Sequence, residues 1–205
     1  FSLPFMKFLI SDGSQNGKII SDSSGNYSFP VQEGQHTITP ILENPEYYTI
    51  SPSNLQVNFP TESNPFNQNF CVTPNGSFND LEITIIPTTV ARPGFEASYK
   101  IIYKNAGTNI LSGAVSFYFN DEVCDFVTSV PSKSNQTSGI LTWDYSSLKA
   151  LESREILITL KLNSPMESPA VNNGDVLSYS ATIFPLINDE TPSNNGIGHR
   201  QTVVG

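Results

Sequence analysis

Short segments that alternate between apolar and polar residues, each ended by turn residues, run through the whole chain of 205 residues. The clearest are residues 155–162 and 176–184, in which at least every second residue is apolar. Side chains of a β-strand point alternately to the two faces of a sheet, so this period of two predicts half-buried strands. Turn pairs such as Asp12-Gly13 and Asn75-Gly76 separate the segments. Short strands at this spacing are typical of β-sandwiches.

The composition supports strands over helices. Asp, Glu, Lys and Arg make up 14% of the residues, well below the ~25% typical of soluble domains. Helices carry such residues on their outward faces, whereas strands can use Thr, Ser and Asn there. Aromatic residues make up 11% of the chain, which supplies compact cores and opposes disorder. The best helix candidate, residues 146–153, is short and weakly periodic. We therefore expect an all-β chain.

The alternating pattern is interrupted at residues 72–79, where Pro74 and Asn75-Gly76 favour turns. We place a domain boundary there and expect two tandem β-sandwiches, residues 1–72 and 73–205. Because the interruption is short, the two domains are expected to be closely coupled. In the first domain we expect strands at residues 5–11, 17–21, 27–29, 36–41, 47–50, 55–59 and 66–72. In the second we expect them at residues 81–86, 97–103, 113–119, 123–127, 139–144, 155–162, 176–184 and 201–204.

Residues 21–40 read SDSSGNYSFPVQEGQHTITP, with turns at Gly25 and Gly34 and an aromatic pair at Tyr27 and Phe29. This arrangement resembles the carboxypeptidase-regulatory-like or collagen-adhesin B-type repeat. The resemblance implies that the first domain is a small transthyretin-like Greek-key sandwich. It also implies that the family's opening strand is missing or lies upstream of Phe1.

The second domain resembles the conserved, immunoglobulin-like surface-repeat domains of secreted bacterial proteins. The resemblance rests on residues 97–113 (ASYKIIYKNAGTNILSG), 141–143 followed by 151–153, and 189–195 (DETPSNN). With the ending QTVVG, the arrangement is most similar to modules of large Bacteroidota proteins exported by the type IX secretion system. The resemblance implies an extracellular or cell-surface location, and its motifs carry no catalytic residue.

The net charge limits the classes of partner. Nineteen acidic and ten basic residues give a formal net charge of −9, and both expected domains are acidic. An acidic surface repels phosphate backbones, so nucleic acid and anionic membrane surfaces are poor candidate partners. No apolar run approaches the ~20 residues needed to cross a bilayer. We expect neither nucleic-acid binding nor membrane insertion.

Candidate catalytic residues do not form a recognisable motif. His36 lies in an alternating segment and suits a surface or cross-strand position, and His199 reads as part of a loop entering a strand. Neither has a nucleophile motif nearby. The pairs Asp121-Glu122 and Asp189-Glu190 are best interpreted as solvated turn carboxylates, although paired carboxylates also serve glycosidases. We predict no catalytic residue and no enzymatic activity.

Calcium is the alternative use of the acidic turns, because turn-borne Asp and Asn oxygens are its preferred ligands. Two sets of residues are candidates, and no calcium-binding motif supports either. They are Asp12, Asp22 and Asn26 in the first domain, and Asp189, Glu190 and Asn194 in the second. No other cofactor is expected.

The two cysteines and the single tryptophan raise separate questions. A disulfide between Cys71 and Cys124 would need Cα atoms within ~7 Å, and we expect two free, largely buried thiols instead. Trp143, between Leu141 and Tyr145, is expected in the core. The alternative is an exposed platform on which a sugar would stack.

We conclude that the chain is a non-catalytic structural and interaction segment, a spacer or adhesin stalk module. Its partners would be neighbouring domains of a longer parent protein, since residues 1–10 and 201–204 read as strands that begin or stop abruptly at the two ends of the sequence. The alternative is a carbohydrate- or protein-binding module of a secreted multidomain enzyme, with an extracellular glycan or protein as partner.

Overall fold

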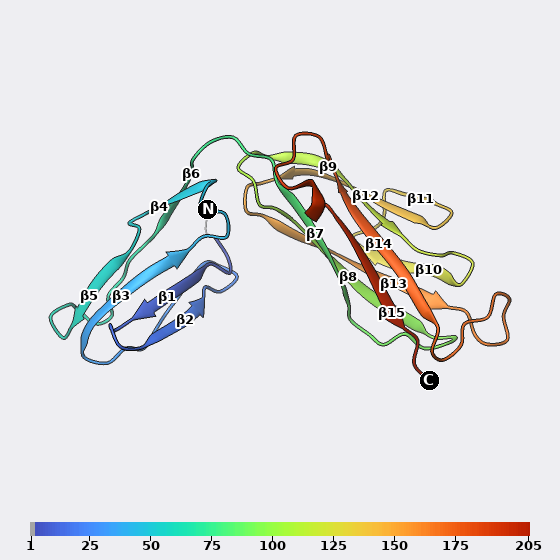
Figure 1. Ribbon diagram of the computed structural model, residues 1–205, viewed down its shortest axis with the longest axis horizontal. Helices are drawn as coiled ribbons and strands as arrows, with labels where there is room; N and C mark the ends of the chain where they lie inside the picture. The colour runs from blue at the N-terminus through green and yellow to red at the C-terminus, as the bar shows by residue number, and fades with distance from the viewer. Residues whose placement is uncertain (1–2) are drawn as a thin grey trace. The chain divides into compact units, whose positions relative to one another are not determined.

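The computed structural model describes residues 3–205. Phe1 and Ser2, at the start of the strand-like segment 1–10, lie outside the described residues. The chain divides into two compact units, Phe1–Ser77 and Phe78–Gly205. Antiparallel strands dominate both units (Figure 1), and within residues 3–205 the only helical element is a three-residue 3-10 turn, η1 (Pro192–Asn194). The prediction of an all-β fold is confirmed.

The first unit is built on one four-stranded antiparallel sheet with the order β2-β1-β3-β5. Its strands are β1 (Lys7–Ser11), β2 (Asn16–Ile20), β3 (Gly34–Ile41) and β5 (Leu55–Phe59). A separate two-stranded ladder joins β4 (Tyr48–Ser51) to β6 (Cys71–Pro74). One face of the sheet supplies the buried core residues Phe8, Ile38 and Val57.

The second layer of the first unit differs from the sequence prediction. Residues 27–29 and 66–70, expected as strands, have no regular secondary structure, and only Cys71 and Val72 of the segment 66–72 lie in a strand, β6. The side chains still alternate: Tyr27, Phe29, Phe66 and Phe70 pack on the core around Phe8. The two segments therefore have the burial pattern of strands without the backbone pairing that defines one.

The division of the chain falls between Ser77 and Phe78, five residues after the expected boundary at residues 72 and 73. That expected boundary lies within β6, whose residues Cys71 to Pro74 pair with β4 of the first unit. The boundary lies later than expected because Cys71 to Pro74 pair with β4. The turn residues Pro74 and Asn75-Gly76 do not reveal this pairing.

The second unit is a sandwich of two antiparallel sheets, with the orders β10-β13-β8-β7 and β11-β12-β9-β14-β15. The first sheet contains β7 (Leu81–Pro87), β8 (Glu96–Asn105), β10 (Cys124–Val130) and β13 (Ser153–Leu162). The second contains β9 (Leu111–Tyr118), β11 (Asn135–Thr137), β12 (Ile140–Leu148), β14 (Val176–Phe184) and β15 (Gly196–Thr202). Alternate residues of these strands face inward and form one continuous core, as the period of two predicts.

Two details of the second unit correct the sequence prediction. β12 continues to Leu148, so the first part of the weak helix candidate 146–153 is strand. The last strand runs from Gly196 to Thr202 and does not begin at residue 201. His199 therefore lies within β15, opposite Tyr179 of β14, and not in a loop that enters a strand.

Candidate functional site

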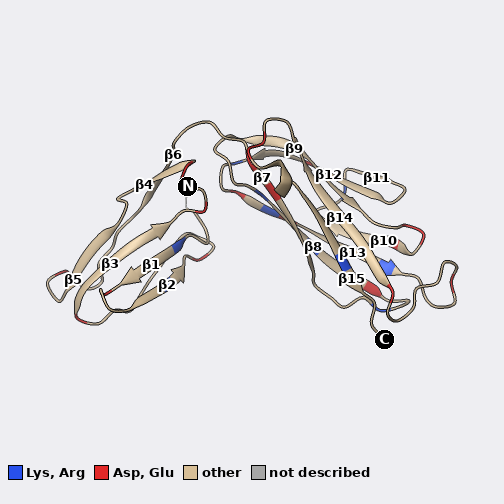
Figure 2. Cartoon of the chain, in the orientation of Figure 1, with Lys and Arg blue, Asp and Glu red and all other residues tan. Residues whose placement is uncertain are grey.

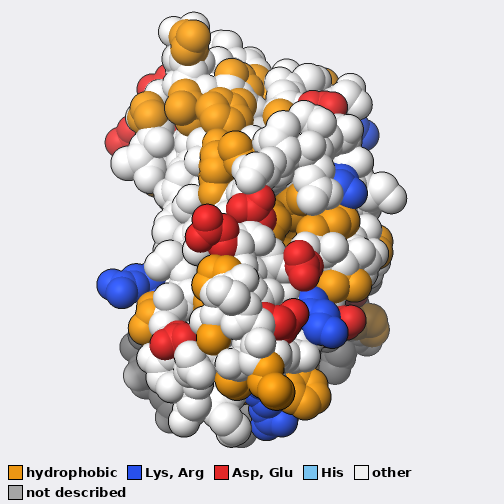
Figure 3. Space-filling view, turned by 90° about the vertical axis from the view of Figure 1, so that its right-hand side faces the viewer, with side chains coloured by type: hydrophobic (Ala, Val, Ile, Leu, Met, Phe, Trp, Pro, Cys, Tyr) orange, Lys and Arg blue, Asp and Glu red, His pale blue; other side chains and the backbone are white. Residues whose placement is uncertain are grey.

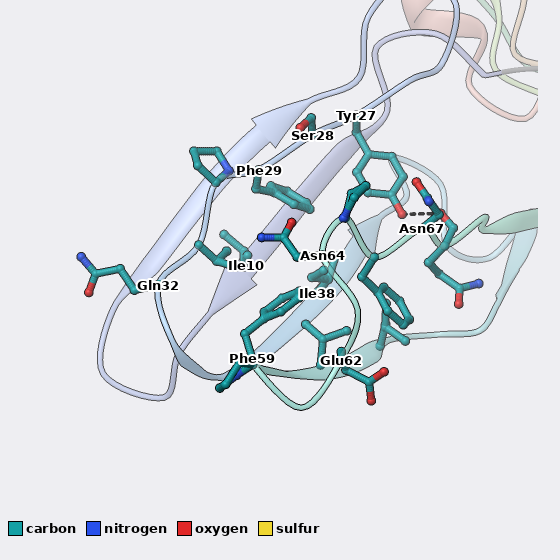
Figure 4. A pocket seen from close by; sticks show the side chains of 18 of the residues that line it. Ile10, Tyr27, Ser28, Phe29, Gln32, Ile38, Phe59, Glu62, Asn64 and Asn67 are labelled. Carbon is teal, nitrogen blue, oxygen red and sulfur yellow. Dashed lines mark hydrogen bonds between the residues drawn. The ribbon is translucent and has the colours of Figure 1, made fainter.

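The described part of the first unit contains an open pocket of about 840 Å³. Figure 4 shows it between the sheet and the two irregular segments, with Phe29, Ile10 and Ile38 facing its interior. Phe59, at the end of β5, and Asn64 also line it, while Gln32 and Glu62 point away from its rim. The pocket exists because residues 27–33 and 60–68 cover this face of the sheet incompletely.

The lining combines apolar rings with uncharged amides. Tyr27, Phe29, Phe59 and Phe66 supply the aromatic rings. Asn64, Asn67 and Gln68 supply the amides, whereas the Gln32 amide points outward. Glu33 and Glu62 are the only ionisable groups among the lining residues besides the Tyr27 phenol. This is the chemistry of a site that binds an uncharged or basic ligand by packing and hydrogen bonds.

Tyr27 joins the two irregular segments. Its hydroxyl donates a 2.5 Å hydrogen bond to the carbonyl oxygen of Gln68, and its ring lies 4.4 Å from the ring of Phe8 and 6.1 Å from that of Phe70, measured between centroids. Burial raises the pKa of the Tyr27 phenol above its usual value. The hydroxyl therefore acts as a donor at neutral pH and fixes this end of the pocket.

The carboxylates that the sequence nominates as calcium ligands in the first unit do not converge. Asp12 lies in the turn between β1 and β2, and Asp22 follows the other end of β2, so the length of a five-residue strand separates them. The backbone N–H groups of Gln15 and Ser14 bond to Asp12 Oδ1 at 2.7 and 2.8 Å, and they lower the pKa of that carboxyl to about 2. Asp22 caps its own turn by accepting from the N–H groups of Ser24 and Asn26.

The second set is also engaged in holding a loop. Asp189 Oδ2 accepts hydrogen bonds from the N–H of Leu81 at 2.8 Å and the amide of Asn195 at 3.0 Å. Its Oδ1 accepts from the N–H of Thr191 at 2.9 Å. Hydrogen-bond donors surround the carboxylate, an arrangement opposite to that of a cation site, where oxygens converge. Among residues 3–205, no three His, Cys, Asp or Glu side chains are grouped so as to hold a metal ion.

The histidines and cysteines occupy separate places in the described chain. His36 is buried in β3, and its Nε2 lies 2.9 Å from the carbonyl oxygen of Gln32. Both cysteines are free thiols; Cys124 is buried as expected, whereas Cys71 is exposed, because β6 lies in a two-stranded ladder outside the core. Burial raises the pKa of the Cys124 thiol to about 11, so this thiol is protonated at neutral pH and is a poor nucleophile.

Trp143 lies in the core of the second unit with 3% of its surface exposed. Its indole N–H donates to the carbonyl oxygen of Pro131 at 3.1 Å. The core position expected from the sequence is confirmed, and the buried ring is not available as a sugar platform.

The second unit also contains buried polar residues that the sequence does not single out. Asn105 is fully buried, and its amide donates to the carbonyl oxygens of Asn109 at 2.6 Å and Leu148 at 3.0 Å. Its Oδ1 accepts from the N–H of Gly107. Only the turn sequence Asn105-Ala106-Gly107 signals this site, and it does not show which carbonyls the side chain reaches. These bonds fasten the fold to itself and leave Asn105 no free group to offer a ligand.

Within the described residues, charged side chains are distributed over both units (Figure 2). Acidic side chains lie on loops of both units (Figure 2). On the face seen in Figure 3, apolar side chains lie in several groups interrupted by charged and other polar ones. A search of the described residues finds no helix with the length and apolar character of a membrane span.

No family model matches the chain, and a search of curated proteins finds no relative. Among solved structures, the CARDB domain of the PF1109 protein from Pyrococcus furiosus, in complex with di-metal ions, is 20% identical over 63% of this chain and 94% of that chain, with a TM-score of 0.44. BslA, a bacterial hydrophobin, is 11% identical over 63% of this chain and 97% of its own, with a TM-score of 0.38. The major pilin SpaD from Corynebacterium diphtheriae is 11% identical over 98% of this chain and 60% of its own, with a TM-score of 0.32. At these scores the likenesses carry no functional argument.

Proposed function

We propose that the chain is a non-catalytic structural and interaction segment of a secreted or cell-surface bacterial protein, in which it acts as a spacer or stalk module. The observation that carries this proposal is the position of the two chain ends of the second unit. Leu81, which opens β7, bonds to Asp189 at one end of the sandwich. At the other end, the N–H of Val204 donates to the carbonyl oxygen of Ala91, just beyond the end of β7, at 2.9 Å. The chain thus enters and leaves the unit at opposite ends (Figure 1).

This geometry suits a segment that transmits force. β7 and β15 are the edge strands of the two different sheets, and each pairs along its length with its neighbour, β8 or β14. Interstrand hydrogen bonds run perpendicular to antiparallel strands. A pull between the two ends is therefore directed along the strands, and several bonds must break together before either edge strand can slide out.

The expected context is the one that the sequence resemblance implies. The motifs at residues 21–40 and 97–113 are similar to those of repeat modules in large Bacteroidota proteins exported by the type IX secretion system. In that setting, the partners of the segment would be neighbouring domains of its own polypeptide, and its location would be the cell surface or the medium.

The test of the spacer role is single-molecule force spectroscopy of the second unit within the full chain. Handles at Ser77 and after Gly205 pull on opposite ends of the unit, whereas handles at Ser77 and Ile187 pull on the same end. Ile187 is 79% exposed in the loop before η1. We expect the first geometry to need at least twice the unfolding force of the second. Equal unfolding forces in the two geometries would contradict the spacer role.

A second function, a binding module, is favoured by the pocket of the first unit. A cavity of about 840 Å³ has the size of a small-ligand site, which commonly measures ~300–1,000 Å³. Its aromatic and amide lining suits either an extracellular glycan or a protein segment. Titration of the labelled chain with soluble polysaccharides and peptides, followed by NMR, tests this role. Ligand-induced shifts at Phe29 and Phe66 are expected, and a panel that leaves both unchanged would contradict it.

A further inference from the structure

The walls of the pocket carry backbone groups that no part of the described chain pairs. Within residues 3–205, the N–H groups of Tyr27, Ser28 and Phe29 make no hydrogen bond, and neither do those of residues 66–70. The carbonyl oxygens of Ser28 and Phe29 likewise have no partner in this part of the chain. Unpaired backbone along an extended segment is a template for another strand.

The two walls also have the side-chain order of strands. Tyr27 and Phe29 are half-buried while Ser28 between them is exposed. On the other wall Phe66, Gln68 and Phe70 are half-buried, and the residues between them, Asn67 and Asn69, are exposed. This period of two aligns the backbone N–H and C=O groups of each wall alternately to its two sides, as in a sheet.

In the described chain, the walls are not joined to each other by a backbone ladder. The Tyr27 side chain, through its hydrogen bond to Gln68 O, connects them instead. Figure 4 shows the Tyr27 ring reaching across from its own segment toward Asn67 at the end of the pocket. The remaining space is open, and Ile10, Ile38 and Phe59 face it from the sheet.

Prolines limit the length of backbone that can pair. Pro30 ends the free stretch of the first wall and Pro65 precedes that of the second, and both line the pocket. Proline has no N–H to donate to a ladder. The pairing stretches are therefore Tyr27–Phe29 and Phe66–Phe70, which allow a strand of three to five residues.

The charge of the rim favours a basic or neutral occupant. Glu33 lines the pocket, Glu62 lies at its edge with the carboxylate turned outward, and no Lys or Arg is among the lining residues. A polypeptide with basic residues at its ends and apolar residues at alternate positions would match the rim carboxylates, the apolar interior and the unpaired backbone together. A glycan would use the rings and amides but would leave the ordered backbone groups without the partners that their spacing suits.

We propose that the pocket is a strand-accepting slot that binds an extended, basic-flanked polypeptide segment of three to five pairing residues between the two walls. This inference rests on the binding role proposed for the pocket and names its ligand class. Backbone hydrogen bonds supply the affinity, and the apolar residues facing the slot select side chains at alternate positions of the ligand.

The test uses the full chain and a defined probe, the acetylated and amidated heptapeptide Lys-Val-Thr-Val-Thr-Val-Lys. A matched peptide with its three valines N-methylated loses the donors of one edge but keeps its side chains and charge. We expect the first peptide to slow amide exchange of alternate residues on each wall, namely either Ser28 or Phe29 on the first and every second residue of 66–70 on the other. The N-methylated peptide should bind at least ~10-fold more weakly, because several hydrogen bonds are lost.

A pair of variants tests the wall itself. Ser28→Pro removes an N–H that has no partner in the free protein, and Ser28→Ala removes the exposed hydroxyl but keeps the N–H. We expect Ser28→Pro to weaken peptide binding at least ~10-fold and Ser28→Ala to leave it unchanged. Thermal unfolding of both variants checks that the first unit is folded. If Ser28→Pro does not fold, the comparison of the two peptides still tests the slot.

The outcomes separate this proposal from the broader binding role. Equal binding of the two peptides, or peptide binding without slower amide exchange at the walls, would overturn the slot. Binding of a soluble polysaccharide such as laminarin or xylan at Phe29 and Phe66, with neither peptide bound, would also overturn the slot but leave the pocket as a binding site. If neither the peptides nor the polysaccharide changes the NMR shifts or the amide exchange of these residues, both the slot and the broader binding role are refuted.

Discussion

The hydroxyl of Tyr27 lies 2.5 Å from the carbonyl oxygen of Gln68, and this side-chain hydrogen bond joins two segments that share no backbone hydrogen bond. Elsewhere in the first unit, strands are held by ladders such as the five paired residues of β1 and β3. Between these two segments, a single hydrogen bond from the Tyr27 phenol replaces a backbone ladder. The opening between the segments is therefore part of the fold of this unit.

Removing that hydroxyl should loosen the first unit selectively. Tyr27→Phe keeps the ring packed on Phe8 but deletes the bond to Gln68, so we expect the free energy of unfolding of the first unit to fall by ~1 kcal/mol. Chemical denaturation followed by NMR signals of residues in β1 and β3 would measure it. Signals from the second unit serve as the internal control, and their midpoint should not move. A first unit of unchanged stability would show that the phenol does not hold the segments.

Gly113 occupies a position where no side chain fits. A Cβ at this residue would lie 2.1 Å from the carbonyl oxygen of Phe184, which also accepts a hydrogen bond from the Tyr145 hydroxyl. We expect Gly113→Ala to destabilise the second unit by at least ~2–3 kcal/mol, because β9 and β14 must separate locally. Gly198→Ala is the matched control in the same sheet, since a Cβ there meets no atom within 4 Å. Similar unfolding midpoints for the two variants would contradict the packing described for Gly113.

The amide of Asn105 should be far less replaceable than its turn sequence suggests. Asn105→Asp places carboxylate oxygens against the carbonyl oxygens of Asn109 and Leu148, which now accept hydrogen bonds from the amide. We expect a loss of ~3–5 kcal/mol at neutral pH, since an unpaired charge would be buried. Asn135→Asp in the exposed edge strand β11 is the control and should cost less than ~0.5 kcal/mol. Urea unfolding monitored by Trp143 fluorescence measures both, and equal losses would contradict the account.

The second unit should lose stability in alkali. Burial raises the pKa of Tyr99 to about 12, that of Cys124 to about 11 and that of Tyr179 higher still. Because the unfolded thiol and phenols ionise near their ordinary values of 9 and 10, the unfolded state binds fewer protons above pH 9. Stability is therefore complete below pH 9 and falls as the pH rises toward 12.

The role of the phenols can be separated from general alkaline damage. The hydroxyls of Tyr99 and Tyr179 lie 2.9 Å apart, and Tyr99 also lies 2.6 Å from Gln201 Oε1. Tyr179→Phe removes one ionising group, so the fall in the urea midpoint between pH 9 and 12 should be shallower in this variant. A slope equal to that of the unaltered chain would show that Tyr179 does not titrate with unfolding.

The sequence predicts the strands of the second unit well because most of their residues follow one rule. In β13 and β14 every second side chain enters a single closed core, so the period of two identifies both the strand and its inward face. Trp143 follows the same rule. Backbone pairing between distant segments is not encoded in any local pattern. The sequence therefore predicts strands at residues 47–50 and 66–72 within a regular series, whereas β4 and β6 form a ladder of their own.

The candidate pocket cannot be predicted from the sequence either, because pairing between distant segments leaves no local pattern. The alternation at Tyr27 and Phe29 correctly predicts that both rings turn inward. It cannot show that the backbone between them lacks a partner, since that depends on how far away residues 66–70 pass. The acidic turns have the opposite effect, because they suggest a metal site that the structure does not bring together. Asp12 and Asp189 look like ligands in the sequence, but they are occupied by N–H groups of their own loops.

We propose that the second unit is closed and structural, whereas the first unit leaves ordered backbone open for a partner. Residue-resolved amide hydrogen exchange of the free, full chain measures both parts at once. We expect the slowest exchange in the central strands β8, β13, β9 and β14, and exchange within ~10-fold of the unprotected rate at Ser28, Phe29 and residues 66–70. Wall amides as well protected as those of β1 and β3 would mean that their hydrogen bonds are already made, and would contradict the claim.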